Sequence, residues 1–207
     1  MLLSRDEKRQ YDLEQICALI DQQDGIVKTA EIESLGVDYR RILSFVDDGT
    51  LIRVKSGYYS SKYYKCSEEQ WIKRLYPDGI LSLESGLYAH GYLKEQPTTW
   101  SVAIDKNTSK SRFKIEYPIV KPLYTEPDVL EVGVTTVDVN GVQMRVYSKE
   151  RLICDCLKYQ EKLDRVDFRR GVFAYIEDET KDIAALMEMA AIRKVTSKVN
   201  NIIGVWL

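Results

Sequence analysis

The sequence has few of the residues and segments that mark disulfide-rich, secreted or membrane proteins. It contains four cysteines in 207 residues, which are too few and too scattered for a disulfide scaffold. The first residues lack the apolar stretch of a signal peptide, and no apolar run approaches the roughly 18 residues needed to cross a bilayer. These absences predict a reduced, soluble, cytoplasmic protein that has no contact with a membrane.

The chain also lacks an excess of charge of either sign. Lysine and arginine total 30 against 32 aspartates and glutamates, a net charge of -2. This balance excludes a generally basic nucleic-acid coat but not a local basic patch. Hydrophobic residues make up 44% and charged residues 30%, which is typical of globular proteins rather than of disordered chains. At roughly 150 residues per domain, the length predicts one or two domains.

Residues that carry catalysis or bind metals are scarce as well. The single histidine, His90, precedes Gly91 at a predicted helix end, where a positive charge would complement the helix dipole. Cys154 and Cys156 have a spacing seen in metal sites, but on a helix they point about 200° apart and cannot bind one ion. The sequence contains no phosphate-binding glycine loop, zinc ligand set or nucleophile elbow. We therefore predict no enzyme, no metal and no cofactor.

The N-terminal part of the chain has the pattern of three helices. Apolar residues spaced three and four positions apart predict a first helix over 6–23, with a capping box formed by Ser4 and Glu7. A second helix over 29–35 and a third over 38–48 each end at a glycine. The residues expected to face the core from these last two helices are Ile32, Leu35, Tyr39, Ile42, Leu43 and Val46.

After the third helix, the hydrophobic period changes from helical to alternating. Apolar and basic residues alternate over 51–55, residues 56–57 form a turn signal, and Tyr58 begins a second strand. Three short helices followed by a hairpin with basic residues is the order of a winged helix-turn-helix. We therefore predict a winged helix-turn-helix DNA-binding domain over residues 1–66.

The third helix and the hairpin carry the side chains that would bind DNA. The N-terminal half of a recognition helix lies in the major groove, and here Arg40, Arg41 and Ser44 lie off the buried stripe. Arginine can donate two hydrogen bonds to guanine or hold a phosphate. Further expected contacts, to the DNA backbone or the minor groove, lie at the start of the second helix and on the hairpin: Lys28, Thr29, Arg53, Lys55 and Tyr58.

Two acidic residues argue against this interpretation. Asp47 and Asp48 end the third helix and would repel DNA if they faced it. A winged helix that makes protein contacts, with a solvated charged surface, therefore stays open as an alternative.

Residues 67–207 are predicted to form a second domain that combines a sheet with helices. Helices are expected after Ser67 and Ser82, and extended segments over 98–104 and 112–120. The clearest hairpin signal is the type I′ dipeptide Asn140-Gly141 within 129–147, which pairs Val139 with Val142, Val137 with Met144 and Thr135 with Val146. Four further helices are expected over 148–160, 165–177, 182–193 and 195–207. The fold class is thus α+β, with a mostly antiparallel sheet in the larger C-terminal domain.

A second group of basic residues lies in and beside the connection between the two extended segments. Its members are Lys106, Lys110, Arg112 and Lys114, with Lys121 beyond them. They could extend a nucleic-acid footprint, meet an acidic partner or form a solvated loop. The apolar residues over 202–207 could likewise pack on the core or form a partner surface.

Three segments, taken in order and spacing, carry a family resemblance. They are the hairpin over 51–59, the stretch over 82–93 and the stretch over 146–155. Over nearly its whole length the chain resembles the AbiEi-type antitoxins of abortive-infection (type IV) toxin–antitoxin systems. Each motif alone has modest specificity, but the ordered set is fairly specific.

The resemblance implies a transcriptional repressor that acts on its own operon. Its winged helix would bind inverted repeats in the promoter, and the protein would counteract a nucleotidyltransferase-like toxin in phage defence. The implied partners are double-stranded DNA and that toxin, with or without direct contact, and the chain would bind DNA cooperatively as a monomer or weak dimer. Carried over by position, DNA reading falls on the third-helix and hairpin residues named above.

The two C-terminal motifs are expected to be helix caps and core rather than catalytic residues. Ser148 would cap a helix whose Leu152 and Cys156 face inward. Gly86 departs from the family pattern, which usually has a larger residue such as alanine, and we expect it to cost roughly 1 kcal/mol of helix propensity.

Two other functions stay open. One is a winged-helix regulator whose C-terminal domain senses a ligand or protein without a toxin partner. The other is a nucleic-acid-processing enzyme that uses Asp138, Asp155 or other carboxylates with a metal. A nucleotidyltransferase-like gene next door would favour the antitoxin, and turnover of nucleic acid with Mg²⁺ or Mn²⁺ would favour the enzyme.

Overall fold

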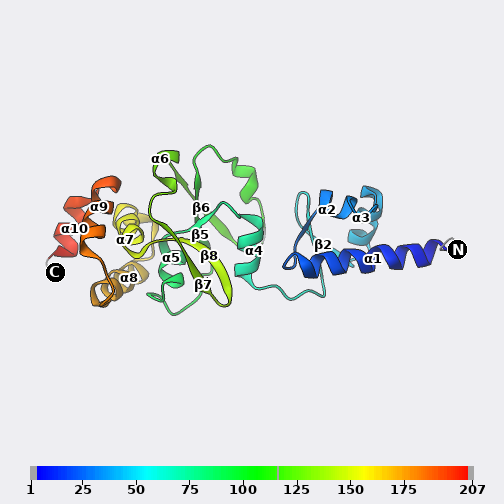
Figure 1. Cartoon of the computed structure of the whole chain (residues 1–207), viewed down its shortest axis with the longest axis horizontal. Helices are drawn as coiled ribbons and strands as arrows, with labels where there is room; N and C mark the ends of the chain where they lie inside the picture. Colours follow the sequence, from blue (N-terminus) through cyan, green and yellow to red (C-terminus); the bar gives the residue numbers. More distant parts are fainter. Residues whose placement is uncertain (1–3, 116, 205–207) are drawn as a thin grey trace. The chain divides into compact units, whose positions relative to one another are not determined.

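The computed structural model describes residues 4–115 and 117–204 and divides into two units (Figure 1). The first unit runs up to Pro77 and also includes Lys114–Pro118; the second contains Asp78–Phe113 and the residues from Ile119 onward. The domains expected from the sequence, 1–66 and 67–207, stay a prediction. Within the described residues, no helix has the length and hydrophobicity that a membrane span requires.

The first unit begins with three helices, α1 (Arg5–Gln22), α2 (Thr29–Glu33) and α3 (Tyr39–Asp47). The predicted capping box is present at the start of α1, where the backbone amide of Glu7 donates to the Ser4 hydroxyl over 3.2 Å. Asp38 caps α3 by accepting from the backbone amide of Arg41 over 2.8 Å. The helices predicted from periodicity and caps are thus confirmed.

The buried faces of α2 and α3 differ from the prediction. Leu35 and Tyr39 are 40% and 43% exposed, whereas Phe45 is fully buried. Leu35 lies beyond the end of α2 and so leaves its helical phase. On α3 the buried residues are Ile42 and Phe45, three positions apart, so Tyr39 at the start of the helix faces solvent.

A three-stranded antiparallel sheet completes the winged helix. Its strands are β1 (Val27–Lys28), β2 (Leu51–Lys55) and β3 (Tyr58–Ser61), in the order β1-β3-β2. The predicted hairpin is confirmed, with Gly57 in the left-handed region at its turn (φ 76°). Strand β1 has only two residues, too few to show a period in the sequence. The core shared by the helices and this sheet contains Ile16, Ile20, Val27, Ile32, Val37, Ile42, Phe45, Leu51 and Tyr59.

The last helix of the first unit is α4 (Glu68–Leu75), capped as predicted by Ser67 and Gln70. Arg74 on α4 donates to the backbone carbonyl of Ile26 over 3.1 Å and to the carboxylate of Glu31 over 2.6 Å. These bonds join α4 to the segment that leads into α2, which explains why its contacts lie with the first unit.

The second unit contains a five-stranded mixed sheet. Its strands are β4 (Ile80–Leu81), β5 (Trp100–Asp105), β6 (Val120–Thr125), β7 (Val134–Val139) and β8 (Val142–Tyr147), in the order β6-β5-β4-β8-β7. The pairs β5–β6 and β4–β8 are parallel, and the pairs β4–β5 and β7–β8 are antiparallel. The α+β class is confirmed, but the prediction of a mostly antiparallel sheet is wrong, because two of the four strand pairings are parallel.

One predicted extended segment is displaced. The described residues 112–115 and 117–119 do not form the expected strand: a 3₁₀ turn, η1, occupies Lys110–Phe113, and β6 begins only at Val120. The intervening Lys114–Pro118 belongs by its contacts to the first unit. Alternation of residue types could not show that this stretch leaves the sheet.

The β7–β8 hairpin has the predicted register. Val139 lies opposite Val142, Val137 opposite Met144 and Thr135 opposite Val146. Asn140 and Gly141 have φ values of 52° and 82°, as a type I′ turn requires. The hairpin begins later than predicted, because a short helix, α6 (Pro127–Leu130), precedes β7.

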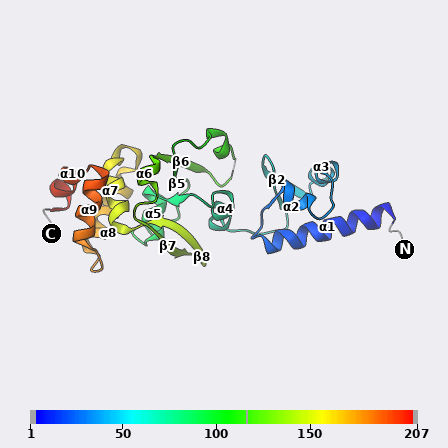
Figure 2. The ribbon, with the colours of Figure 1, turned by 45° about the horizontal axis from the view of Figure 1, so that its top comes forward.

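Helices surround this sheet and complete the second unit. They are α5 (Leu83–Ala89), α7 (Lys149–Lys158), α8 (Arg165–Glu177), α9 (Ile183–Arg193) and α10 (Thr196–Ile202), with a 3₁₀ turn, η2 (Gln160–Lys162), after α7. Figures 1 and 2 both show α7 to α10 gathered at one end of this unit. The last three residues of the helix predicted over 195–207, and of the apolar stretch over 202–207, lie outside the described residues.

The two C-terminal motifs meet where α5 packs on α7. A Cβ atom at Gly86 would lie 2.6 Å from Leu152 Cδ1, so the glycine lets the two helices approach closely. Leu152 and Cys156 face the core as predicted, and the Ser148 hydroxyl accepts from the backbone amide of Arg151 over 3.3 Å. The expected propensity cost of Gly86 is therefore offset by packing.

A buried ion cluster connects α7 to α9. Asp155 accepts from Arg151 Nε over 3.0 Å and from Arg193 Nε over 2.5 Å, and all three residues are at most 3% exposed. Arg151 Nη1 also donates to the carbonyl oxygens of Val129 and Val132 over 2.8 and 2.7 Å. Asp155, considered above as a catalytic carboxylate, is thus occupied by two structural arginines.

Candidate nucleic-acid interface

The N-terminal half of α3 presents the predicted recognition residues in three different environments. Arg40 is exposed and has no ion-pair partner among residues 4–115 and 117–204. Arg41 pairs with the largely buried Asp12 of α1 over 3.7 Å. The hydroxyl of Ser44 accepts a hydrogen bond of 2.8 Å from Arg9 of α1. Arg40 is therefore the freest of the three to contact a base.

Arg9 is a residue that the sequence did not single out. It lies on α1, and its guanidinium carbon is 4.5 Å from the centre of the Phe45 ring on α3. Besides Ser44, it donates to the carboxylate of Asp48, just beyond the end of α3. Arg9 thus fixes α3 on α1. No sequence signal could have identified it, because the contact depends on how the two helices pack.

A groove of about 460 Å³ lies between the start of α1 and the start of α3. The charged and polar residues that line it are Arg5, Asp6, Arg9, Asp38, Arg40, Arg41 and Ser44. Arg9 and Arg41 are paired with Asp48 and Asp12, so Arg5 and Arg40 are the lining arginines that have no ion-pair partner among the described residues. These two cations could hold an anionic ligand such as a phosphate.

The two aspartates at the end of α3 differ in their environment. Asp48 accepts from the hydroxyl and the backbone amide of Thr50 and from Arg9, and these contacts hold its pKa below the usual range. Asp48 is therefore ionised, but its charge is locally compensated. Asp47 is exposed. The repulsion expected from both aspartates is thus reduced for Asp48.

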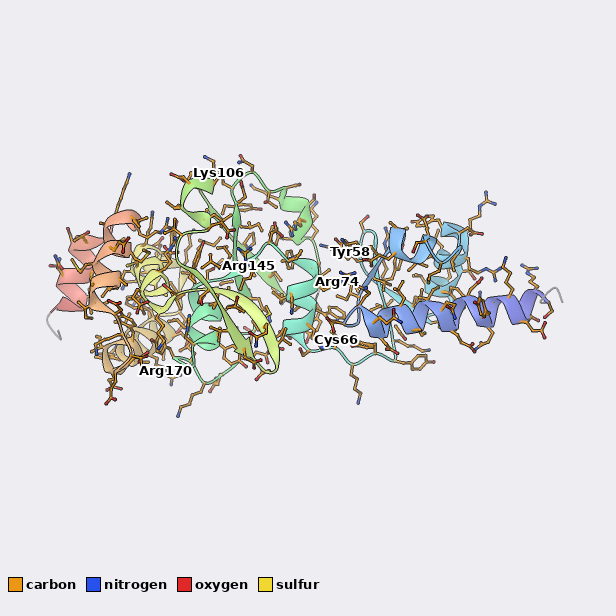
Figure 3. All side chains as sticks on the ribbon, in the orientation of Figure 1. Tyr58, Cys66, Arg74, Lys106, Arg145 and Arg170 are labelled. Carbon is orange, nitrogen blue, oxygen red and sulfur yellow. The ribbon has the colours of Figure 1, made fainter. Side chains whose placement is uncertain are left out.

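At the wing, the predicted residues gather around one tyrosine ring. The ammonium of Lys55 is 4.5 Å from the centre of the Tyr58 ring, and that of Lys28 is 6.0 Å away (Tyr58 is labelled in Figure 3). Lys55 also lies 5.1 Å from the centre of the Tyr76 ring. Lys55 is thus held by cation–π contacts, which leaves it less free to reach DNA.

The backbone amides at the start of α2 are already used. The amide of Lys28 donates to the Glu31 carboxylate over 2.8 Å, and that of Thr29 donates to the carbonyl of Gly57 over 3.0 Å. These two amides are therefore not free to bind a phosphate, which differs from the expectation. Lys28 can act only through its side chain.

Arg53 lies on the edge strand of the small sheet. It is exposed and lies opposite Tyr59, while Lys55 lies opposite Tyr58, so a bulge separates the two basic residues. Because of this bulge they do not alternate as in a regular strand. Arg53 has no ion-pair partner among the residues that the structure describes, and it is the freest cation of the wing.

The members of the second basic group differ in their pairing and in the unit to which they belong. Lys106 pairs with Glu126, and Arg112 donates both of its terminal nitrogens to Asp78, one of them over 2.8 Å. Lys110 is exposed on η1, whereas Lys114 belongs to the first unit and lies near Arg53 in one cavity. These residues therefore lie in different surroundings.

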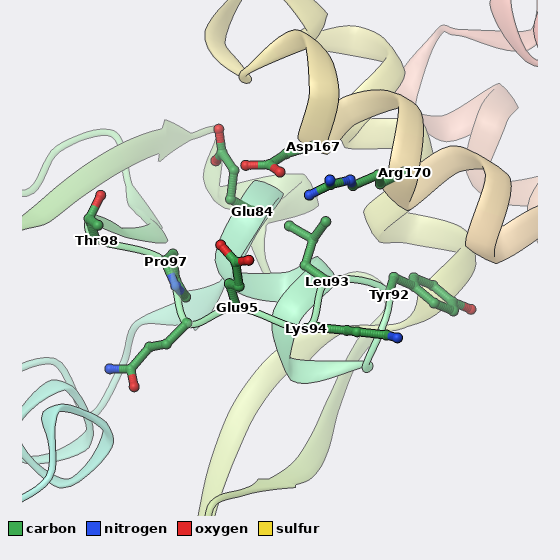
Figure 4. A pocket seen from close by; sticks show the side chains of 10 residues that line it. Glu84, Tyr92, Leu93, Lys94, Glu95, Pro97, Thr98, Asp167 and Arg170 are labelled. Atoms are coloured by element: carbon green, nitrogen blue, oxygen red, sulfur yellow. The ribbon is translucent and has the colours of Figure 1, made fainter.

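The second unit contains a cavity of about 530 Å³ (Figure 4). Glu84 on α5 and Asp167 and Arg170 on α8 meet at one side of it, and Glu95 points toward them.

Among the described residues, no group of histidine, cysteine, aspartate and glutamate side chains could hold a metal ion. Asp138 accepts from the Gly141 amide and so shapes its own turn.

The surroundings of His90 favour its neutral form over the cation that we expected to complement a helix end. Its Nε2 donates to the backbone carbonyl of Tyr147 over 2.7 Å. Burial lowers the pKa of His90, an effect that the bond to Tyr147 opposes. Burial also raises the pKa of the thiols of Cys154, to about 12, and of Cys156, which keeps both protonated and unreactive.

Comparison with known proteins identifies the N-terminal region. Residues 14–62 match the model of a family described as transcriptional regulator, AbiEi antitoxin. The match runs from within α1 to just past β3, so it covers most of the helix-turn-helix and the whole wing. No curated protein matches the chain. The resemblance expected from the sequence is confirmed for this region.

Proposed function

We propose that the protein is a DNA-binding antitoxin that represses its own operon, because residues 14–62 match the family model of AbiEi transcriptional regulators. It binds inverted repeats in its promoter and counteracts a nucleotidyltransferase-like toxin encoded beside it. The observation that carries DNA binding is the arginine-lined groove at the start of α3, where Arg40 is exposed and has no acidic partner among the residues that the structure describes.

Two sets of contacts are proposed. The start of α3 enters the major groove, where Arg40 reads a base and Arg41, tethered to Asp12, lies beside it. Arg5 and Arg9 on α1 line the protein groove between α1 and α3, and they face the phosphates next to the bases that Arg40 contacts. Arg53 on the wing contacts the neighbouring backbone. Base contacts supply sequence preference, and phosphate contacts supply salt-dependent affinity.

The DNA-binding part of this proposal is tested by fluorescence anisotropy. The full chain is titrated against the duplex upstream of its own gene and against a shuffled duplex, each at two salt concentrations. We expect tight, salt-dependent binding to the native duplex and a preserved gap over the shuffled one. Equal, weak binding to both duplexes would contradict a sequence-specific repressor.

The antitoxin part has its own test. If the gene next door encodes a nucleotidyltransferase-like protein, its induction should arrest growth, and co-expression of this chain should relieve the arrest. An Arg40→Ala variant should lose promoter binding and still relieve the arrest when expressed from a foreign promoter. A neighbour of another kind, or no relief, would instead favour a regulator without a toxin partner.

A further inference from the structure

The first unit contains a second cavity, beside the wing, that DNA reading does not explain. It measures about 580 Å³ and lies between edge strand β2 and the segment Lys114–Pro118. Ile52 and Arg53 line it from β2, Trp71 from α4, and Lys114 and Tyr117 from the segment. It is separate from the groove at the start of α3, with which it shares no lining residue.

Aromatic side chains form one part of this cavity. The rings of Trp71 and Tyr117 meet edge to face, with their centres 6.0 Å apart and their planes at 68°. Tyr117 is 57% exposed, and its hydroxyl donates to the carboxylate of Glu68, which fixes the ring. This bond raises the pKa of Tyr117 to about 12, so the phenol stays neutral. A fixed, half-exposed ring beside the exposed Ile52 is suited to stack against a planar apolar group.

Two cations form the other part. Arg53 and Lys114 line the cavity, and neither has an ion-pair partner within the described ranges 4–115 and 117–204. The carboxylate of Glu68 accepts from the Tyr117 hydroxyl and stays charged, but it forms no ion pair with either cation. The cavity thus combines two cations that have no ion-pair partner among the described residues with an aromatic and aliphatic wall. Its volume lies in the range of small-molecule sites, in which a few polar groups orient a mainly apolar ligand.

From this lining we infer that the cavity binds a small planar ring that carries one anionic group, and that such a ligand competes with DNA for Arg53. The ring lies against Tyr117 and Ile52, and the carboxylate or phosphate pairs with Arg53 and Lys114. The competition rests on the proposed function, because only there is Arg53 a DNA contact. The site itself does not depend on that function.

Calorimetric titration of the full chain tests the site without DNA. The probes are benzoate and adenosine 5′-monophosphate, each compared with its neutral counterpart, benzamide or adenosine. We expect at least one anion to bind about tenfold more tightly than its neutral counterpart, as an added charge-assisted bond should give. The two probes distinguish a carboxylate from a phosphate. If neither anion binds better than its counterpart, the inference is overturned.

Matched variants locate the binding. Lys114→Ala should weaken anion binding about tenfold, whereas Lys110→Ala, which removes the same charge from an exposed position on η1, should leave it unchanged. If both variants lost the same anion affinity, the loss would come from the change in net charge. The assignment of Lys114 to the binding site would then be overturned. Trp71→Phe, which keeps a ring in the wall, should retain binding.

Competition is measured with the same probes added to the promoter titration. A saturating anion should weaken binding to the native duplex several-fold in the wild type and less in Lys114→Ala. Anion binding that leaves promoter affinity unchanged would overturn the competition. A chain that binds anions but no specific DNA would instead contradict the proposed function while the site stands.

Discussion

Two arginines of the first unit and two of the second differ in burial and in pairing. Arg40 and Arg53 lie on the surface of the winged helix without acidic partners among the described residues. Arg151 and Arg193 are 0% and 3% exposed and share the carboxylate of Asp155. Under the proposed function, the same side chain serves binding in one unit, whereas it serves folding in the other. What separates the two roles is the acid beside it, which residue type alone does not show.

The largest expected effect is on the buried cluster. Asp155→Ala leaves two guanidinium groups buried without a carboxylate, so we expect the free energy of unfolding to fall by about 3–5 kcal/mol. Urea denaturation measures this change. Asp47→Ala, which removes an exposed carboxylate, should change stability by less than about 0.5 kcal/mol. Similar losses in both variants would remove the contrast between the two units.

Gly86→Ala tests whether packing or helix propensity dominates at the α5–α7 contact. Propensity alone favours alanine by about 1 kcal/mol. The new Cβ would lie 2.6 Å from Leu152 Cδ1, however, so we expect a net loss of about 1–2 kcal/mol of unfolding free energy. Leu152→Val in the same chain should recover part of the loss. A stabilised Gly86→Ala variant would show that the helices can move apart without cost.

Arg41 tests the boundary between the two roles, because it lies on the recognition helix yet pairs with a largely buried acid. Arg41→Ala should lower the unfolding free energy by about 1–2 kcal/mol, since Asp12 then lacks its partner. Adding Asp12→Asn should restore most of the lost free energy of unfolding. If Arg41→Ala loses DNA binding and the double variant loses it too, Arg41 contacts DNA. If the double variant binds DNA normally, the loss in Arg41→Ala came from its lower stability.

On the wing, Arg53 and Lys55 should differ in their effect on salt dependence. Arg53→Ala should flatten the slope of log affinity against log salt by about one, the value for one lost phosphate contact. Lys55→Ala should change the slope less, because its ammonium lies against the Tyr58 and Tyr76 rings. Equal slopes for the two variants would mean that Lys55 leaves these rings to reach DNA.

The smallest effect concerns pH and the only histidine. Burial lowers the pKa of His90 in the folded chain below its unfolded value of about 6.5. The unfolded chain therefore binds the proton first, and stability present above about pH 6.5 is lost as the pH falls toward the folded value. The urea midpoint should drop between pH 7.5 and 5.5 in the wild type and less in His90→Gln. An equal drop in both would exclude His90 as the cause.

Local signals in the sequence were sufficient for much of the fold. The capping box at Ser4, the wing over 51–55 and the register around Asn140-Gly141 depend on residues close together in the chain, and all are present. The departure of Lys114–Pro118 from the sheet depends on contacts with distant residues. Hydrophobic periodicity cannot report such contacts, so the prediction of a strand there was wrong.

The candidate interface was predictable in position but not in detail. The third helix and the wing follow from sequence order, and the family match over 14–62 agrees with them. Arg9, the tether of Arg41 to Asp12 and the rings that hold Lys55 all arise where separate elements pack. These contacts decide which cations stay free, and only the folded chain shows them.

A pair of arginine variants tests whether the exposed Arg40 of α3 reads DNA. Arg40→Ala and Arg169→Ala each remove one exposed helix arginine, from α3 in the first unit and from α8 in the second. In the anisotropy titration with the native upstream duplex, we predict that Arg40→Ala weakens binding about tenfold or more and narrows the gap over the shuffled duplex, while Arg169→Ala does neither. Equal affinities for the two variants would contradict the account.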